Sequence, residues 1–146
     1  MAPVEYVQTT NGTLDEIKVG TSLSFTKTVS ESDVYLFSGI TGDFSPNHVD
    51  EEYMKDTRYG GRLAHGALLV GLMSGASSRM RVGRTVSLGY DRVRFVAPVR
   101  FGDTITTNYT ITEVDLEKKR IYNKVECVNQ HGEVVGSAVH IRAFVG

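Results

Sequence analysis

An acidic and a basic side chain lie five residues apart in the segment TGDFSPNH, residues 41–48. Asp43 offers a carboxylate and His48 an imidazole, and such a pair can take a proton from water and return one to a substrate. Pro46 stands between them and restricts the backbone of Ser45 to extended angles. The segment is therefore interpreted as a kinked loop, neither helix nor strand, that brings the two side chains onto one water molecule.

A second candidate group opens the longest apolar segment, HGALLVGLMSGASSRM, residues 65–80. The segment has helical length and is apolar on almost every side, which predicts a helix buried on most faces. The first N–H groups of a helix have no partner inside it and carry partial positive charge. Gly66 would let a carbonyl oxygen approach such an N–H, which predicts an oxyanion site. His65 fits a helix-start residue and a substrate-side residue equally well.

The segments before this helix predict one strand and two short helices. Residues 22–29 alternate apolar and polar side chains, which indicates a strand. Ser30 and Asp33 have the spacing of a capping box, which predicts that a helix begins there. Asp50 can cap a further short helix. Residues 58–64 are predicted to form a loop.

Four strand-like segments with short connections follow and predict an antiparallel meander. They comprise residues 85–99, 101–117, 118–130 and 134–146. A sheet of about five strands around one apolar helix is an α+β architecture. We expect a single domain over residues 1–146, with a loosely ordered entry at 1–19. A second copy is expected to cover the sheet's far face and edges, which predicts a homodimer or a higher homo-oligomer.

Composition narrows the classes of partner. The 146-residue chain has a net charge of −1 and no basic stripe, so no nucleic-acid partner is expected. No apolar run approaches the ~20 residues that cross a bilayer, and no secretion signal is evident. The single cysteine, Cys127, fits a cytoplasmic setting. No metal or cofactor is expected, because the four histidines lack ligand spacing and no phosphate-binding loop is present. His131 and His140 are interpreted as structural.

The layout resembles the hotdog fold, and two motifs resemble the MaoC-like, or (R)-specific enoyl-CoA, hydratases. These are GDFSPNHVD at 42–50 and AHGALLVGLMSG at 64–75, with FVAPVRFGDTI at 95–105 resembling the family's strand pair. The resemblance implies a hydro-lyase that adds water reversibly to an enoyl thioester carried by CoA or an acyl carrier protein. It implies that Asp43 and His48 share the water, that Gly66 binds the thioester oxygen and that Ser74 completes the site.

Two positions depart from the family pattern. Ser45 stands where many members carry an Asn that helps to hold the water, so Ser45 is placed on the substrate side. Residues 59–62 replace a Pro found ahead of the His-Gly motif, which predicts a differently shaped loop over the acyl pocket. Arginines could meet the polar end of CoA at the pocket mouth. The candidates are Arg58, Arg62, Arg92 and Arg94.

Two other functions stay open. Hotdog thioesterases usually place a carboxylate on or near the central helix, whereas residues 65–80 contain none. A non-catalytic acyl-thioester-binding subunit should have lost Asp43 or His48, and this chain keeps both. The residues do not decide which of the pair is the base and which the acid. They also leave open the acyl chain length and the pathway, with fatty-acid metabolism among the possibilities.

Overall fold

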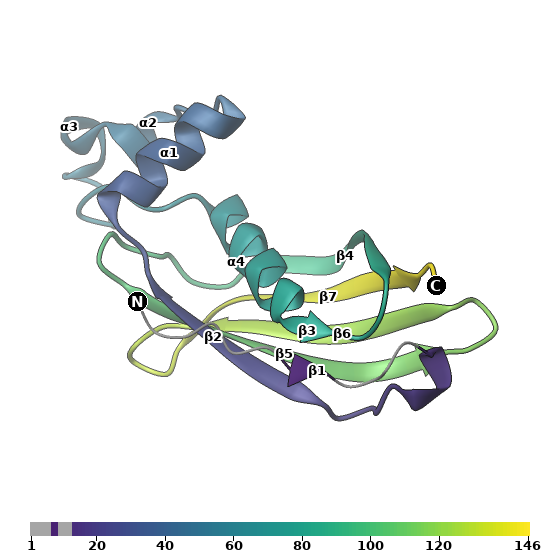
Figure 1. Ribbon diagram of the computed structural model, residues 1–146. Helices are drawn as coiled ribbons and strands as arrows, with labels where there is room; N and C mark the ends of the chain where they lie inside the picture. Colours follow the sequence, from purple (N-terminus) through teal and green to yellow (C-terminus); the bar gives the residue numbers. More distant parts are fainter. Residues whose placement is uncertain (1–6, 9–12) are drawn as a thin grey trace.

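The sheet and the helix predicted from the sequence are both present in the computed structural model, which describes residues 7–8 and 13–146 (Figure 1). The expected loosely ordered entry at 1–19 falls largely on residues 1–6 and 9–12, which lie outside the described residues. A single 3-10 turn, η1 (Leu14–Glu16), precedes the sheet. The five long strands are β2 (Ser22–Thr28), β4 (Thr85–Phe95), β5 (Thr104–Asp115), β6 (Arg120–Val128) and β7 (Val134–Phe144).

The strand order corrects the predicted meander. The antiparallel sheet runs β2-β5-β6-β7-β4, so β4 pairs with β7 and not with β5. The connection from β4 to β5, residues 96–103, must therefore run from the β4 edge of the sheet past β7 and β6 to reach β5. Backbone hydrogen bonds hold it on the way: Val99 accepts from Ala64 N–H at 2.8 Å, and Gly102 N–H donates to Val29 at 2.7 Å. This connection becomes a wall of the candidate site.

The central helix α4 (Gly66–Arg79) lies across one face of the sheet (Figure 1). Leu69, Met73 and Ala76 are buried and pack into one apolar core with the inward side chains of the strands. The expectation of burial on most faces is only half met. Small side chains leave one stripe of the helix exposed, namely Ala67, Gly71, Ser74 and Ser78.

A second, two-stranded parallel sheet was not predicted. It pairs β1 (Val7–Gln8) with β3 (Met80–Arg81), which follows directly after α4. Two-residue strands carry too little period-2 pattern to be read from sequence. Among the helices of the described residues, none is long and apolar enough to cross a membrane.

Three short helices stand beyond the end of the sheet, near the first turn of α4 (Figure 1). They are α1 (Glu31–Thr41), α2 (Pro46–Val49) and α3 (Glu51–Met54). The predicted capping box of Ser30 and Asp33 and the predicted cap at Asp50 are both confirmed. The expectation of a loop throughout 43–48 is wrong, because Pro46 occupies the first position of a helical turn, where its missing N–H costs nothing.

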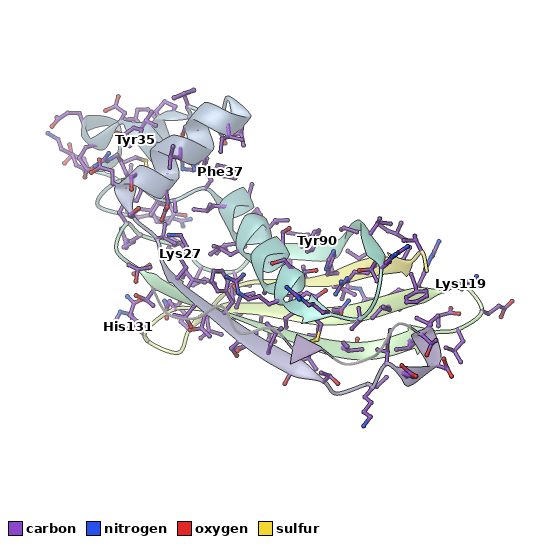
Figure 2. The ribbon with its side chains drawn as sticks, in the orientation of Figure 1. Lys27, Tyr35, Phe37, Tyr90, Lys119 and His131 are labelled. Carbon is purple, nitrogen blue, oxygen red and sulfur yellow. The ribbon has the colours of Figure 1, made fainter. Side chains whose placement is uncertain are left out.

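Side chains of α1 pack between the three short helices and α4. Phe37 points from α1 toward α4 and lines a small apolar hollow with Leu68 and Leu72 (Figure 2). His131 lies in the exposed turn between β6 and β7, and His140 lies on β7, as expected of structural residues (Figure 2).

Candidate active site

Asp43 follows directly after the end of α1. Gly42 ends that helix with a φ of 79°, a left-handed conformation that glycine adopts without strain. One oxygen of the carboxylate, Oδ1, accepts hydrogen bonds from the Ser45 hydroxyl at 2.5 Å and the Ser45 N–H at 3.1 Å. These bonds lower the pKa of Asp43, first through the hydroxyl and then through the N–H. The carboxylate therefore stays ionised, and its other oxygen is left to face His48.

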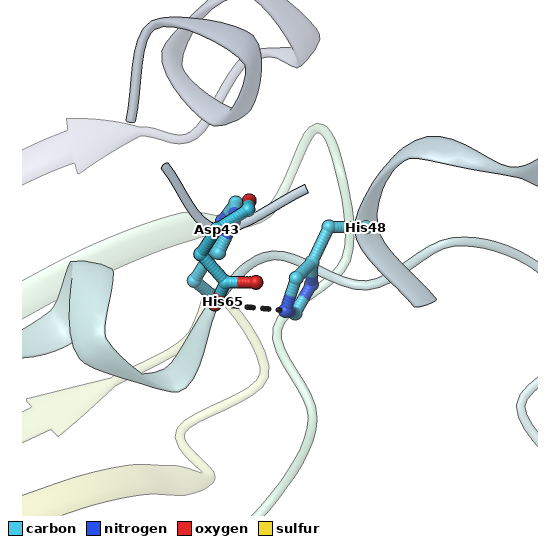
Figure 3. Close-up of side chains that lie close together, drawn as sticks. All are labelled: Asp43, His48 and His65. Atoms are coloured by element: carbon cyan, nitrogen blue, oxygen red, sulfur yellow. Dashed lines mark hydrogen bonds and ion pairs between the residues drawn. The ribbon is translucent and has the colours of Figure 1, made fainter. Parts of the chain in front are cut away.

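His48 lies on α2 and is almost buried. Its Nδ1 lies 2.8 Å from the Leu63 carbonyl oxygen, which can only accept, so Nδ1 carries the proton. In the neutral ring, Nε2 is then an acceptor. It lies 3.9 Å from Oδ2 of Asp43, too far for a direct hydrogen bond (Figure 3). The Asn47 amide also lies 3.3 Å from this nitrogen.

His65 and Gly66 join the two other residues at the start of α4. The imidazole of His65 stacks on that of His48, with 3.7 Å between ring centroids. Gly66 is the first residue of α4, so its N–H has no partner within the helix. A Cβ at Gly66 would lie 2.4 Å from the ring of Phe95. The Phe95 ring thus leaves no space for a side chain at Gly66, and the expected approach of a carbonyl oxygen also favours glycine there. The motif at 95–105 assigned no role to Phe95, which the end of β4 places here beside β7.

A pocket of about 400 Å³ lies against these groups. The 95–99 segment forms one wall, and His48, His65 and Gly66 are among the other lining residues, which do not include Asp43. Of the four candidate arginines, Arg58 lines the pocket, whereas Arg92 and Arg94 are not among its lining residues. Arg62 is held in ion pairs with Glu31 at 2.7 Å and Glu51 at 2.8 Å, which raise the pKa of its guanidinium.

Ser74 is not brought into this site. It lies eight residues after Gly66, about 12 Å along the helix axis, and its exposed side chain is near the Tyr90 hydroxyl. Within one protomer, Ser74 therefore belongs to the exposed stripe of α4. Ser45 does belong to the site, but it contacts Asp43.

The three side chains Asp43, His48 and His65 each offer one potential metal-ligand atom within 4.8 Å of the others. Hydrogen bonds to backbone carbonyls already use Nδ1 of His48 and Nε2 of His65. The two rings are tilted by only 28°, so the lone pairs of the remaining nitrogens run nearly side by side. Metal ligation needs lone pairs that converge on one point, so these orientations do not suit a metal ion.

Comparison with known proteins agrees with this architecture. The chain matches the family profile of the MaoC like domain over residues 15–134. It is 40% identical over 113 residues to an (R)-specific enoyl-CoA hydratase of Rhodospirillum rubrum, covering 77% of this chain and 78% of that protein. It is 31% identical over 121 residues to a 3-hydroxybutyryl-CoA dehydratase of Methylorubrum extorquens, covering 83% and 76% of the two chains.

Solved structures show the same fold. An R-hydratase of Pseudomonas aeruginosa in its unliganded form superposes with a TM-score of 0.81 at 31% identity, over 90% of this chain and 84% of that one. Such hydratases share the hotdog arrangement seen here, an antiparallel sheet against one long helix. With the family profile covering most of its length, the chain belongs to the MaoC-like domain family.

Proposed function

We propose that this protein is an (R)-specific enoyl-CoA hydratase, which also runs in reverse as a 3-hydroxyacyl-thioester dehydratase. The observation that carries the proposal is the pair of facing acceptors, Oδ2 of Asp43 and Nε2 of His48, 3.9 Å apart. A water about 2.8 Å from each would direct its two O–H groups about 90° apart, close to its own bond angle. Both O–H groups of the water then donate hydrogen bonds, and a lone pair on its oxygen is free to attack the β-carbon of the substrate.

The hydrogen bonds of Asp43 support a proposal for which of Asp43 and His48 accepts the proton of the water. A carboxylate whose pKa is lowered is a weak base, so the water's proton passes to Nε2 of His48 while Asp43 stays ionised. The water oxygen bonds to the β-carbon, and the thioester oxygen gains enolate character against the Gly66 N–H. The proton on His48 then moves to the α-carbon, which restores the neutral imidazole. The same steps reversed remove water.

The substrate class is proposed from the relatives, whose names specify enoyl-CoA, 3-hydroxybutyryl-CoA and 3-hydroxyacyl thioesters. Arg58 at the pocket is the cation that we propose meets the polar end of the CoA or carrier arm. The proposed steps use no metal ion and no cofactor.

The test is the loss of enoyl-thioester ultraviolet absorbance when purified protein is added to crotonyl-CoA. Asp43→Asn replaces the ionised acceptor of the water by a neutral amide and should lower kcat by about 10²–10³-fold, the usual cost of one lost electrostatic contact in an active site, with folding and acyl-CoA binding intact. Asp56→Asn, in the exposed turn after α3, is the matched control and should keep full activity. Full activity in Asp43→Asn would overturn the mechanism. Release of free CoA thiol would indicate a thioesterase, and binding without turnover a non-catalytic subunit.

We also propose a homodimer formed at the free edge of β4. Apolar side chains are exposed along and just after this strand, with Val86, Leu88 and Phe95 about half accessible. Sedimentation equilibrium should give a dimer for the wild type and a monomer for Leu88→Lys.

The unpaired thiol of Cys127 is buried, which suits the cytoplasmic location that we propose.

A further inference from the structure

His65 contacts both halves of the candidate pair, the main chain of Asp43 and the ring of His48. It immediately precedes α4, yet its side chain makes no hydrogen bond to the first turn of that helix. Only 2% of its surface is exposed, so it lies in the pocket wall and offers almost no surface to a ligand. A substrate-side role, which the sequence left open, is therefore poorly supported.

The hydrogen bonds of His65 fix its protonation. Its Nε2 lies 3.0 Å from the carbonyl oxygen of Asp43 and 3.2 Å from the hydroxyl of Ser38 on α1. The carbonyl can only accept, so Nε2 carries the proton and donates it to the Asp43 main chain. Nδ1 is buried and has no hydrogen-bond partner among the described residues. A second proton there would be a buried donor without an acceptor among the described residues.

Packing fixes the plane of the ring. Phe37 covers one side of it at 4.7 Å between centroids, and His48 stacks on the imidazole at 3.7 Å with a tilt of 28°. His48 therefore rests on the ring of His65, and that ring sets the plane in which Nε2 of His48 faces Asp43.

We propose that His65 is a positioning residue, whose Nε2–H and ring hold the main chain of Asp43 and the ring of His48 in register with each other. The inference rests on the proposed hydratase function, because it explains how the separation of the two acceptors is maintained. His65 touches neither the water nor the thioester. A displacement of about 1 Å between reacting groups can cost on the order of 10²-fold in rate, which sets the size of the expected effect.

Two substitutions separate the donor from the ring. His65→Phe keeps an aromatic ring against His48 and loses the donor to Asp43. His65→Gln places an amide N–H where the imidazole Nε2 lies and loses the stacked ring. Ser38→Ala is the matched control, because it removes the other partner of the same nitrogen without touching Asp43.

Steady-state hydration of crotonyl-CoA is measured for all three, with the melting temperature recorded to confirm folding. We expect His65→Phe to lower kcat by about 10- to 100-fold with KM within about twofold. His65→Gln should recover at least part of that loss, and Ser38→Ala should stay close to wild type. Wild-type kcat in folded His65→Phe would overturn the proposal, as would equal losses in the Phe and Gln variants.

Nitrogen-15 NMR of the imidazoles provides a reading that does not depend on turnover. At neutral pH the two stacked rings should show opposite tautomers, with the proton on Nε2 of His65 and on Nδ1 of His48. The His48 signals should move in His65→Phe. If the wild type is inactive on crotonyl-CoA, the proposed function fails while these signals still test the positioning role. An Nδ1–H tautomer for His65 would refute that role.

Discussion

Acid should destabilise this protein through His140, a histidine far from the candidate site. It lies on β7 beneath α4, is 2% exposed and accepts or donates at both ring nitrogens. The Tyr109 hydroxyl lies 2.7 Å from Nδ1, and the Ser87 hydroxyl lies 2.7 Å from Nε2. Burial, assisted by the nearby Arg142 guanidinium, lowers the pKa of His140 to about 4 from a usual 6.5.

The sign and size of the effect follow from linkage. The unfolded chain takes up a proton at His140 below about pH 6.5, whereas the folded chain does so only near pH 4. The contribution to stability is therefore complete above pH 6.5 and is lost as the pH falls through 4. The difference between these pKa values corresponds to about 3 kcal/mol in the free energy of unfolding.

Urea unfolding followed by circular dichroism measures this difference. Between about pH 7.5 and about pH 4, the free energy of unfolding should fall by about 3 kcal/mol more in the wild type than in His140→Gln. His131→Gln removes a histidine from the exposed turn and should follow the wild-type curve. Parallel curves for wild type and His140→Gln would refute the reasoning, as would an NMR titration of His140 with a midpoint near 6.5.

Three shorter predictions concern the site and its supports. Ser45→Ala removes the hydroxyl bond that contributes most to the low pKa of Asp43, so the acid limb of the kcat/KM profile should move to higher pH. Gly66→Ala should destabilise the fold by about 1–3 kcal/mol in urea unfolding, because its Cβ meets the Phe95 ring; Phe95→Leu in the same chain should relieve this. Ser30→Ala should cost about 1 kcal/mol by the same measurement, through loss of the α1 cap.

Local signals in the sequence predicted the elements well. The capping box at Ser30, the cap at Asp50 and the period-2 segments all depend on residues close in the chain, and each marks a real boundary within a few residues. The short helix at Pro46 was missed because a four-residue turn has no periodicity to detect. Proline at its first position was the available signal, and it was interpreted only as a bend.

Long-range order could not be predicted in the same way. Sequence-adjacent strands are often neighbours, which favoured the meander, but nothing in the strands β4 and β5 encodes that a connection crosses the sheet. The pairing of β4 with β7 places Phe95, the last residue of β4, over Gly66, and the crossing connection carries 96–99 to the pocket wall. Ser74 was drawn into the site by resemblance alone, and the rise along α4 places it elsewhere in the protomer.

The chemistry of the site depends on backbone atoms that no motif contains. An Asp and a His five residues apart are ordinary turn and helix residues until the Leu63 carbonyl fixes the proton on Nδ1 of His48 and leaves Nε2 as an acceptor. Ser45 leaves Asp43 as a second acceptor. Two acceptors can hold water but cannot stabilise a developing oxyanion, so a donor must come from another element. The N–H of Gly66, at the start of α4 in the same pocket as His48, is the donor that we propose for the thioester oxygen.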